Sequence, residues 1–206
     1  MQWLFRILTL LLLTTAPAKA GSLVLLVDIS SSIEVTEMHL QLDSYARLMN
    51  DMPTIRHVHI EVILFGQTPE LIASGNYKDA ALAFATYDVI GPEYRGTTCL
   101  TEALKLVQAR LNSLSQPVII DISGDGEANC YSDKYLQNVL DEIAETGARI
   151  NTLYIDKAPN YIQSENNLRF YQSLTRNSGF TMKAEDFYDF ELALFEKLTL
   201  ELAELE

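Results

Sequence analysis

Short apolar segments alternate along this chain with helical patterns, and this alternation constrains the fold more than any other feature. The apolar segments are residues 23–29, 57–65, 117–123 and 148–155. The helical segments, residues 35–52, 99–114, 132–147 and 167–179, place apolar residues three and four positions apart. Because strands joined through helices pair in parallel and bury both sheet faces, the pattern predicts a doubly wound, mostly parallel α/β sheet with helices on both faces.

Two weaker segments complete the predicted sheet. Residues 70–77 form a candidate edge strand, short and antiparallel, and residues 179–187 a final strand before a closing helix over residues 190–206. Gly179 is expected to stop the preceding helix, as glycine often does. No repeat or linker divides residues 21–206, so we expect one Rossmann-like domain.

The first 20 residues have the order of a secretory signal peptide. The charged Arg6 precedes an apolar run over residues 7–16, and small residues end the segment at Ala20. We expect cleavage there and export to the periplasm or the medium. An uncleaved anchor is the alternative, although the run is shorter than the roughly 20 apolar residues of a membrane span. We therefore expect no stable membrane insertion of the mature chain.

The charge balance narrows the classes of partner. The chain has 28 acidic and 15 basic residues, a formal net charge of −13 at pH 7. Such a charge repels phosphate backbones and anionic lipid, so we expect no nucleic acid partner. It suits cations or basic partners, and solubility alone is the simpler explanation.

Oxygen-bearing side chains follow the apolar segments at three places. Asp28, Ser30 and Ser32 leave the first segment at every second position, Thr98 begins a helical segment, and Asp125 stands between two glycines. Ligands of open α/β sheets bind beyond the carboxyl ends of the strands, where these residues should meet. Because hard oxygen donors without nearby His or Cys favour a magnesium-type cation, the residues predict a divalent metal site.

Each of these three motifs also has a structural interpretation. Asp28 could be a turn residue and one of the serines a helix N-cap. Thr97 or Thr98 could equally be a plain cap, and Gly-Asp-Gly is an ordinary turn. Their occurrence together at one predicted sheet edge favours the metal site.

The motif Asp-Ile-Ser-Ser-Ser at residues 28–32, with Thr98 and Asp125, resembles the metal-ion-dependent adhesion site of von Willebrand factor type A domains. Thr98 matches better than Thr97 because a small and an apolar residue, Ala103 and Leu104, follow it at the family's spacing. The likeness covers nearly the whole of residues 21–206. Residues 121–126, 150–155 and 195–203 further resemble a bacterial group of exported proteins of this type whose function is uncharacterised.

The resemblance implies a bound Mg²⁺ or Mn²⁺ ion. Ser30, Ser32 and Thr98 would hold the ion directly, and Asp28 and Asp125 mainly through water. One coordination position would stay open for an Asp or Glu carboxylate of a protein partner. The resemblance therefore implies an exported, metal-dependent protein-binding module, and it names neither the partner nor the oligomeric state.

Given this resemblance, Cys99 and Cys130 belong to two loops that converge on the cation. Cys99 follows Thr98, and Cys130 comes five residues after Asp125. Because export exposes cysteines to an oxidising compartment, we expect them to form a disulfide that ties the loops together. A free, buried pair is the alternative.

Asp121 and Ser123 share the alternation of Asp125 along an otherwise apolar segment. A carboxylate there is costly unless it is paired. We interpret both residues as supports that hold the metal ligands in place without touching the metal. For Asp121, a polar network in the core is the alternative.

An enzyme is the competing class of function. Phosphatases of the haloacid dehalogenase type also carry an aspartate after their first strand, so Asp28 could serve Mg²⁺-dependent hydrolysis. That family needs a second aspartate two residues later, where Ser30 stands. Signatures of serine hydrolases, nucleotide-binding loops, zinc proteases and dinucleotide folds are absent from the sequence. We therefore predict a non-enzymatic module.

Overall fold

Six strands form one sheet in the order β3-β2-β1-β4-β5-β6. Neighbouring strands run parallel except β2 and β3, which pair antiparallel. The strands are β1 (Ser22–Asp28), β2 (His59–Phe65), β3 (Pro69–Gly75), β4 (Val118–Gly124), β5 (Arg149–Ile155) and β6 (Thr181–Ala184). The predicted α/β sheet with an antiparallel edge strand is thus confirmed.

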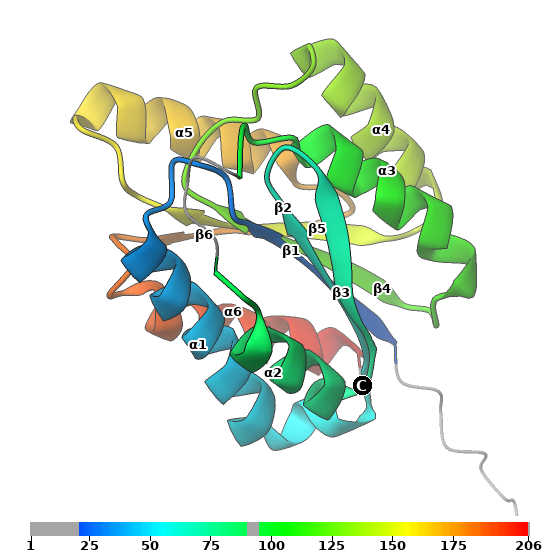
Figure 1. Ribbon diagram of the computed structural model, residues 1–206. Coiled ribbons are helices and arrows are strands. Elements are labelled where there is room, and N and C mark those ends of the chain that lie inside the picture. Colours follow the sequence, from blue (N-terminus) through cyan, green and yellow to red (C-terminus); the bar gives the residue numbers. More distant parts are fainter. Residues whose placement is uncertain (1–20, 90–94, 206) are drawn as a thin grey trace, which may run out of the picture.

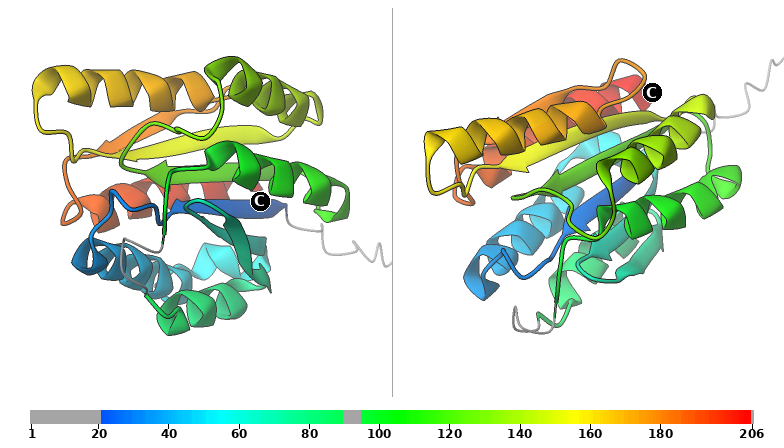
Figure 2. Two further views of the ribbon diagram at one scale, coloured as in Figure 1. Left: turned by 45° about the horizontal axis from the view of Figure 1, so that its top comes forward. Right: turned by 90° about the horizontal axis from the view of Figure 1, so that it is seen from above.

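Helices cover both faces of this sheet, as Figures 1 and 2 show. One apolar cluster unites a sheet face with α1 (Val35–Asp51), α2 (Tyr77–Thr86) and α6 (Phe190–Leu205). The other cluster unites the opposite face with α3 (Leu100–Arg110), α4 (Asp133–Glu145) and α5 (Tyr161–Leu174). Two short 3-10 helices, Pro53–His57 and Leu111–Ser113, follow α1 and α3. All seven residues of β1 are buried, because this strand lies inside the sheet between both helical layers.

The structure differs from the sequence expectations in two helices. The helix α2, residues 77–86, was not expected; its signal is the capping box of Asn76 and Asp79, in which each side chain accepts a backbone N–H. The helix α5 begins at Tyr161 and ends at Leu174, so Gly179 does not stop it. Gly179 lies instead against the backbone of β5, where a Cβ atom would come within 1.9 Å of the Ile150 carbonyl oxygen.

The computed structural model describes residues 21–89 and 95–205. The predicted signal peptide, residues 1–20, lies outside this part of the chain. Within the described ranges, no helix has both the length and the apolar character that crossing a membrane requires.

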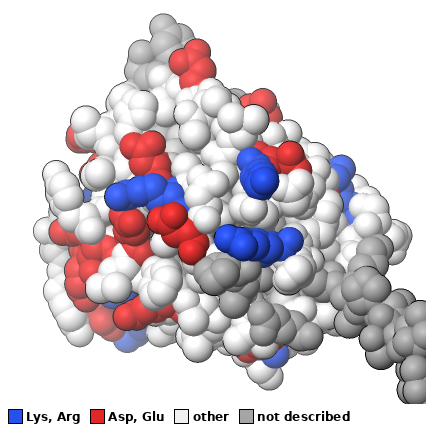
Figure 3. Space-filling model, turned by 90° about the horizontal axis from the view of Figure 1, so that it is seen from below, with Lys and Arg blue, Asp and Glu red and all other residues white. Residues whose placement is uncertain are grey.

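Acidic side chains gather on one side of the face that α1 and α2 cover, at the left of Figure 3. Basic side chains are fewer there and lie among the acidic ones. The negative formal charge of the sequence is therefore visible as a surface feature on this side of the molecule.

Candidate metal site

The candidate site lies where the chain changes its direction of winding. From β1 the sheet extends through β2 on one side and through β4 on the other, and all three strands are parallel. The carboxyl ends of β1 at Asp28 and β4 at Gly124 are therefore neighbours. Such a switch point leaves a crevice in which ligands of open α/β sheets bind.

A chain of hydrogen bonds joins the three hydroxyl groups and one carboxylate of the predicted site. Thr98 Oγ1 donates to Ser30 Oγ over 2.9 Å, and the hydroxyls of Ser30 and Ser32 are 3.0 Å apart. Ser32 Oγ donates to Asp125 Oδ1 over 2.7 Å. The loops that follow β1, precede α3 and follow β4 thus bring their oxygen atoms into one cluster, as the sequence predicted.

Asp28 is joined to the cluster through Ser30. Its Oδ1 atom accepts the Ser30 N–H over 2.7 Å, whereas its Oδ2 atom is buried with no hydrogen-bond partner among the described residues. Burial, together with the nearby charge of Asp125, raises the pKa of Asp28 to about 7. Burial raises the pKa of Asp125 as well. A buried carboxylate oxygen without a donor lacks compensation for its lost hydration, which a cation or its water would supply.

Gly124 makes the room that Asp28 needs. A Cβ atom on Gly124 would lie 2.9 Å from Asp28 Oδ2 and 2.5 Å from the hydroxyl of Tyr171. That tyrosine comes from α5 and donates to the Gly126 carbonyl over 3.2 Å. The glycine is therefore required by the close approach of two side chains.

The five cluster residues differ in their exposure to solvent. Asp28, Ser30, Thr98 and Asp125 are buried, whereas Ser32 is exposed. Lys157, from the loop after β5, donates to the Ser32 carbonyl over 2.8 Å and pairs with Glu37 over 2.5 Å. A ligand from outside would reach the hydroxyls past Ser32 and beside the Lys157 ammonium group.

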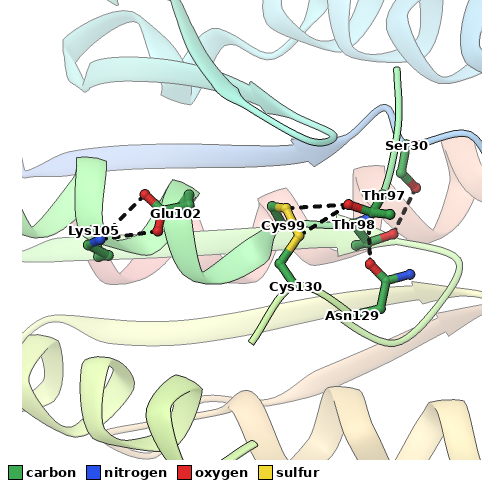
Figure 4. Close-up of a disulfide and its surroundings, with 8 residues drawn as sticks. All are labelled: Ser30, Thr97, Thr98, Cys99, Glu102, Lys105, Asn129 and Cys130. Atoms are coloured by element: carbon green, nitrogen blue, oxygen red, sulfur yellow. Dashed lines mark hydrogen bonds and ion pairs between the residues drawn. A yellow bond between two sulfur atoms is a disulfide. The ribbon is translucent and has the colours of Figure 1, made fainter. Parts of the chain in front are cut away.

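The structure contains the expected disulfide between Cys99 and Cys130. Next to it, the Asn129 side chain accepts the Thr98 N–H over 3.0 Å, and the Asn129 N–H bonds the Thr98 carbonyl over 3.1 Å. Figure 4 shows these residues around Thr98. Asn129 was not among the predicted site residues, although its place between Asp125 and Cys130 was a signal.

Arg95, which was not among the predicted site residues either, supports the loop after β1 from the segment before α3. The side chain is buried, donates to the Ile29 carbonyl over 3.2 Å and also bonds the Ile33 carbonyl. On the other side, the Gln41 side chain donates to the Asp28 carbonyl over 3.3 Å. Such contacts between distant segments have no signature in the sequence.

Asp121 and Ser123 pair with the helices that cover the sheet, and among the described residues no hydrogen bond or ion pair joins their side chains to the five cluster residues. Ser123 Oγ accepts the Tyr45 hydroxyl of α1 over 3.0 Å. Asp121 pairs with Lys197 of α6 over 2.5 Å, and Lys197 also pairs with Glu201 over 2.5 Å. All three of these charged residues are fully buried. The contacts of Asp121 therefore fit a polar network in the core, the alternative interpretation.

The type of donor atom in the cluster determines which metal ions it could bind. Three hydroxyls and two carboxylates supply only hard oxygen, the donor type that magnesium and manganese prefer. The described residues contain no group of three His, Cys, Asp or Glu side chains placed to hold a metal. A cation at this site would therefore depend on the Ser and Thr hydroxyls as ligands. Such a cation would also compensate the Asp28 oxygen that has no hydrogen-bond partner.

Two protein-family sequence models match this chain. The sequence model of the von Willebrand factor type A domain matches residues 23–127. That of a family described as "Protein of unknown function (DUF1194)" matches residues 76–206. A comparison with curated proteins gave no match.

Several solved structures share the fold at low sequence identity. Proximal thread matrix protein 1 from the mussel byssus has a TM-score of 0.69 and 17% identity, over 89% of this chain and 48% of that one. A second structure of it, described with a zinc-occupied adhesion motif, has a TM-score of 0.64 and 18% identity over the same shares. The chain thus spans about half the length of this protein.

Two further neighbours come from a bacterium and a parasite. The pilus adhesin SpaC from Lactobacillus rhamnosus GG has a TM-score of 0.69 and 13% identity, over 92% of this chain and 31% of that one. The manganese-loaded TRAP protein of Plasmodium vivax has a TM-score of 0.63 and 19% identity, over 86% and 72%. These structures share the fold, and the two sequence matches show that the chain belongs to the von Willebrand factor type A domain family and, over residues 76–206, to the family DUF1194.

Proposed function

We propose that this chain is an exported protein-binding module that recognises its partner through a bound Mg²⁺ or Mn²⁺ ion. The observation that carries the proposal is the buried oxygen cluster with the unpaired Asp28 Oδ2 atom at its base. Folding leaves this oxygen without a donor at a cost of roughly 1–3 kcal/mol. A cation in the cluster, or a water on it, would remove that cost.

The cluster residues divide into two groups by charge. The hydroxyls of Ser30, Ser32 and Thr98 would contact the ion, and the carboxylates of Asp28 and Asp125 would hold it through water. Because the direct ligands are neutral, most of the ion's charge would remain available to an anion. The ion, when bound, would supply a positive anchor for one carboxylate.

The exposure of Ser32 indicates where the partner would approach. A partner's Asp or Glu side chain reaching the cluster there would pass the Lys157 ammonium group, 2.8 Å from the Ser32 carbonyl. Lys157 would attract the same carboxylate. Two structural neighbours support the proposal, since one is a pilus adhesin and the other is manganese-loaded.

Export belongs to the proposal and rests on the signal-like residues 1–20. The disulfide between Cys99 and Cys130 agrees with an oxidising compartment. We propose no nucleic acid or membrane partner, because the chain is strongly acidic. We also propose no catalysis: residue 30, where a phosphatase would need its second aspartate, is a serine whose N–H bonds Asp28.

A capture experiment tests the proposal. The chain, immobilised without residues 1–20, would be exposed to envelope extract with Mn²⁺ or with chelator, and the variant Asp28→Ala would serve as control. A partner should be retained only by the unchanged chain with Mn²⁺. Amidation of carboxylates in the extract should abolish its retention.

Two results would count against this function. One is retention that persists in chelator, and the other is retention from amidated extract. Metal-dependent turnover of a generic phosphoester, lost in Asp28→Ala, would favour the hydrolase instead.

A further inference from the structure

Thr98 is fastened to the loop after β4 by two consecutive residue pairs. The backbone N–H and carbonyl of Thr98 both bond Asn129, over 3.0 and 3.1 Å, and the disulfide joins the following residues, Cys99 and Cys130. Figure 4 shows the two pairs side by side. We name these four residues the Thr98 clamp.

The clamp connects two parts of the candidate metal site. Asp125 lies four residues before Asn129 in the same loop, and Thr98 Oγ1 bonds Ser30 over 2.9 Å. The segment of Thr98 is also held from the β1 side, where the Ser31 N–H bonds the Gly96 carbonyl over 2.9 Å. Opening the clamp would free Thr98 and Asp125 to move relative to each other.

We propose that the clamp positions Thr98 and Asp125 for the metal, so that reduction of the disulfide weakens metal binding. Asn129, Cys99 and Cys130 are positioning residues in this proposal, which rests on the proposed function. Ordering a ligand before binding removes an entropy cost that a loose ligand would incur on binding. Metal uptake, and with it partner recognition, would depend on the redox state of the surroundings.

The disulfide is placed where a dithiol reductant can reach it. Cys99 is buried, whereas Cys130 is partly exposed in its loop. A reductant thiolate would attack Cys130 Sγ, breaking the S–S bond and releasing Cys99 as a thiolate at the N-terminus of α3, which favours negative charge. The second thiol of the reductant would then displace Cys130, leaving two protein thiols and an oxidised, disulfide-bonded reductant.

Calorimetric titration of Mn²⁺ into the metal-free chain, oxidised or reduced with a dithiol, tests the clamp. Reduction should lower the affinity by about three- to ten-fold, the effect of one or two loosened side chains. The double variant Cys99→Ser with Cys130→Ser should bind as the reduced chain does, and reductant should not change it. Asn129→Ala should weaken binding in the oxidised chain, whereas Asn166→Ala, an exposed asparagine on α5, should not.

Amide hydrogen exchange in the metal-free chain gives a second readout that needs no metal. The amides of Thr98 and Asn129 should exchange faster after reduction, while β1 stays protected. Equal Mn²⁺ affinity of the oxidised and reduced chains, both folded by circular dichroism, overturns the proposal. If the oxidised chain takes up no metal, the proposed function fails, and exchange alone decides the clamp: unchanged exchange at Thr98 overturns it.

Discussion

Ser32 donates a hydrogen bond of 2.7 Å to Asp125, although 93 residues separate them. The bond closes the cluster that begins at Thr98 and passes through Ser30. Its members come from three loops that only the completed sheet brings together. Metal binding should therefore respond to single changes in any of the three loops while the fold persists.

Mn²⁺ should raise the melting temperature of the unchanged chain, and Thr98→Val should abolish this rise. The variant removes the hydroxyl that would contact the ion and its bond to Ser30, worth about 1 kcal/mol. The matched control is Thr97→Val, since Thr97 Oγ1 lies beside the disulfide sulfurs and outside the hydroxyl cluster. Thermal melts with metal and with chelator provide the comparison, and a full metal response in Thr98→Val would argue against this ligand.

Gly124→Ala should destabilise the chain by about 1–3 kcal/mol and weaken metal binding. The added methyl group would lie 2.5 Å from the Tyr171 hydroxyl and 2.8 Å from Asp28 Cβ, so the Asp28 carboxylate would have to move. Gly126→Ala, two residues later in the loop after β4, is the control, because a Cβ there meets nothing within 4 Å. Urea unfolding and Mn²⁺ titration of both variants measure the effect, and equal behaviour of the two would refute the packing argument.

Lys197→Met should destabilise the chain by about 3–5 kcal/mol. The lysine is the only cation that pairs with the buried carboxylates Asp121 and Glu201 among the described residues, so its loss would leave both without a counter-charge. Denaturant unfolding at pH 7 gives the value. Stability near that of the unchanged chain would mean that the two carboxylates are already neutral.

Glu201→Gln should make the pH dependence of stability flatter. Burial raises the pKa of Glu201 from 4.5 to about 7 in the folded chain, helped by the charge of Asp121. Between these two values the folded state keeps a proton that the unfolded state loses, so this residue's contribution to stability falls as the pH rises.

The variant cannot ionise, yet it keeps the acceptor oxygen that bonds Asn151. Its stability relative to the unchanged chain should increase with pH between about 4.5 and 7, by on the order of 1.4 kcal/mol per pH unit. Urea unfolding over this range tests it, with Glu196→Gln on the exposed face of α6 as control. Parallel curves for Glu201→Gln and the unchanged chain would show that Glu201 does not titrate there.

The strands could be predicted because their signal is local. The segments that became β1, β2 and β4 are largely apolar runs, as is typical of strands buried on both faces, whereas β5 also contains Asn151 and Thr152. The first turn of α5 was missed because its side chains Tyr161 and Ile162 are exposed and give no apolar periodicity. Only the Asn160 side chain, which accepts the Gln163 N–H, marks that start.

The cluster residues could be predicted because each follows a strand or begins a helix at the same sheet edge. The residues that hold the cluster loops in place could not be predicted from the sequence. Asn129, Arg95 and Tyr171 act on segments 31 to 66 residues away or on loops whose path the sequence does not specify. For a related reason the sequence left Asp121 between two interpretations, since strand alternation gives the face of a side chain but not the lysine of α6 that pairs with it.

Calorimetric titration of Mn²⁺ into the oxidised, metal-free chain tests the central claim most directly, with Asp28→Asn as the paired variant. We expect the unchanged chain to bind one ion in a saturable manner. The Asp28→Asn variant should stay folded and lose this binding, because the substitution removes the negative charge at the base of the cluster. An unchanged chain that is folded and takes up no Mn²⁺ or Mg²⁺ would contradict the account.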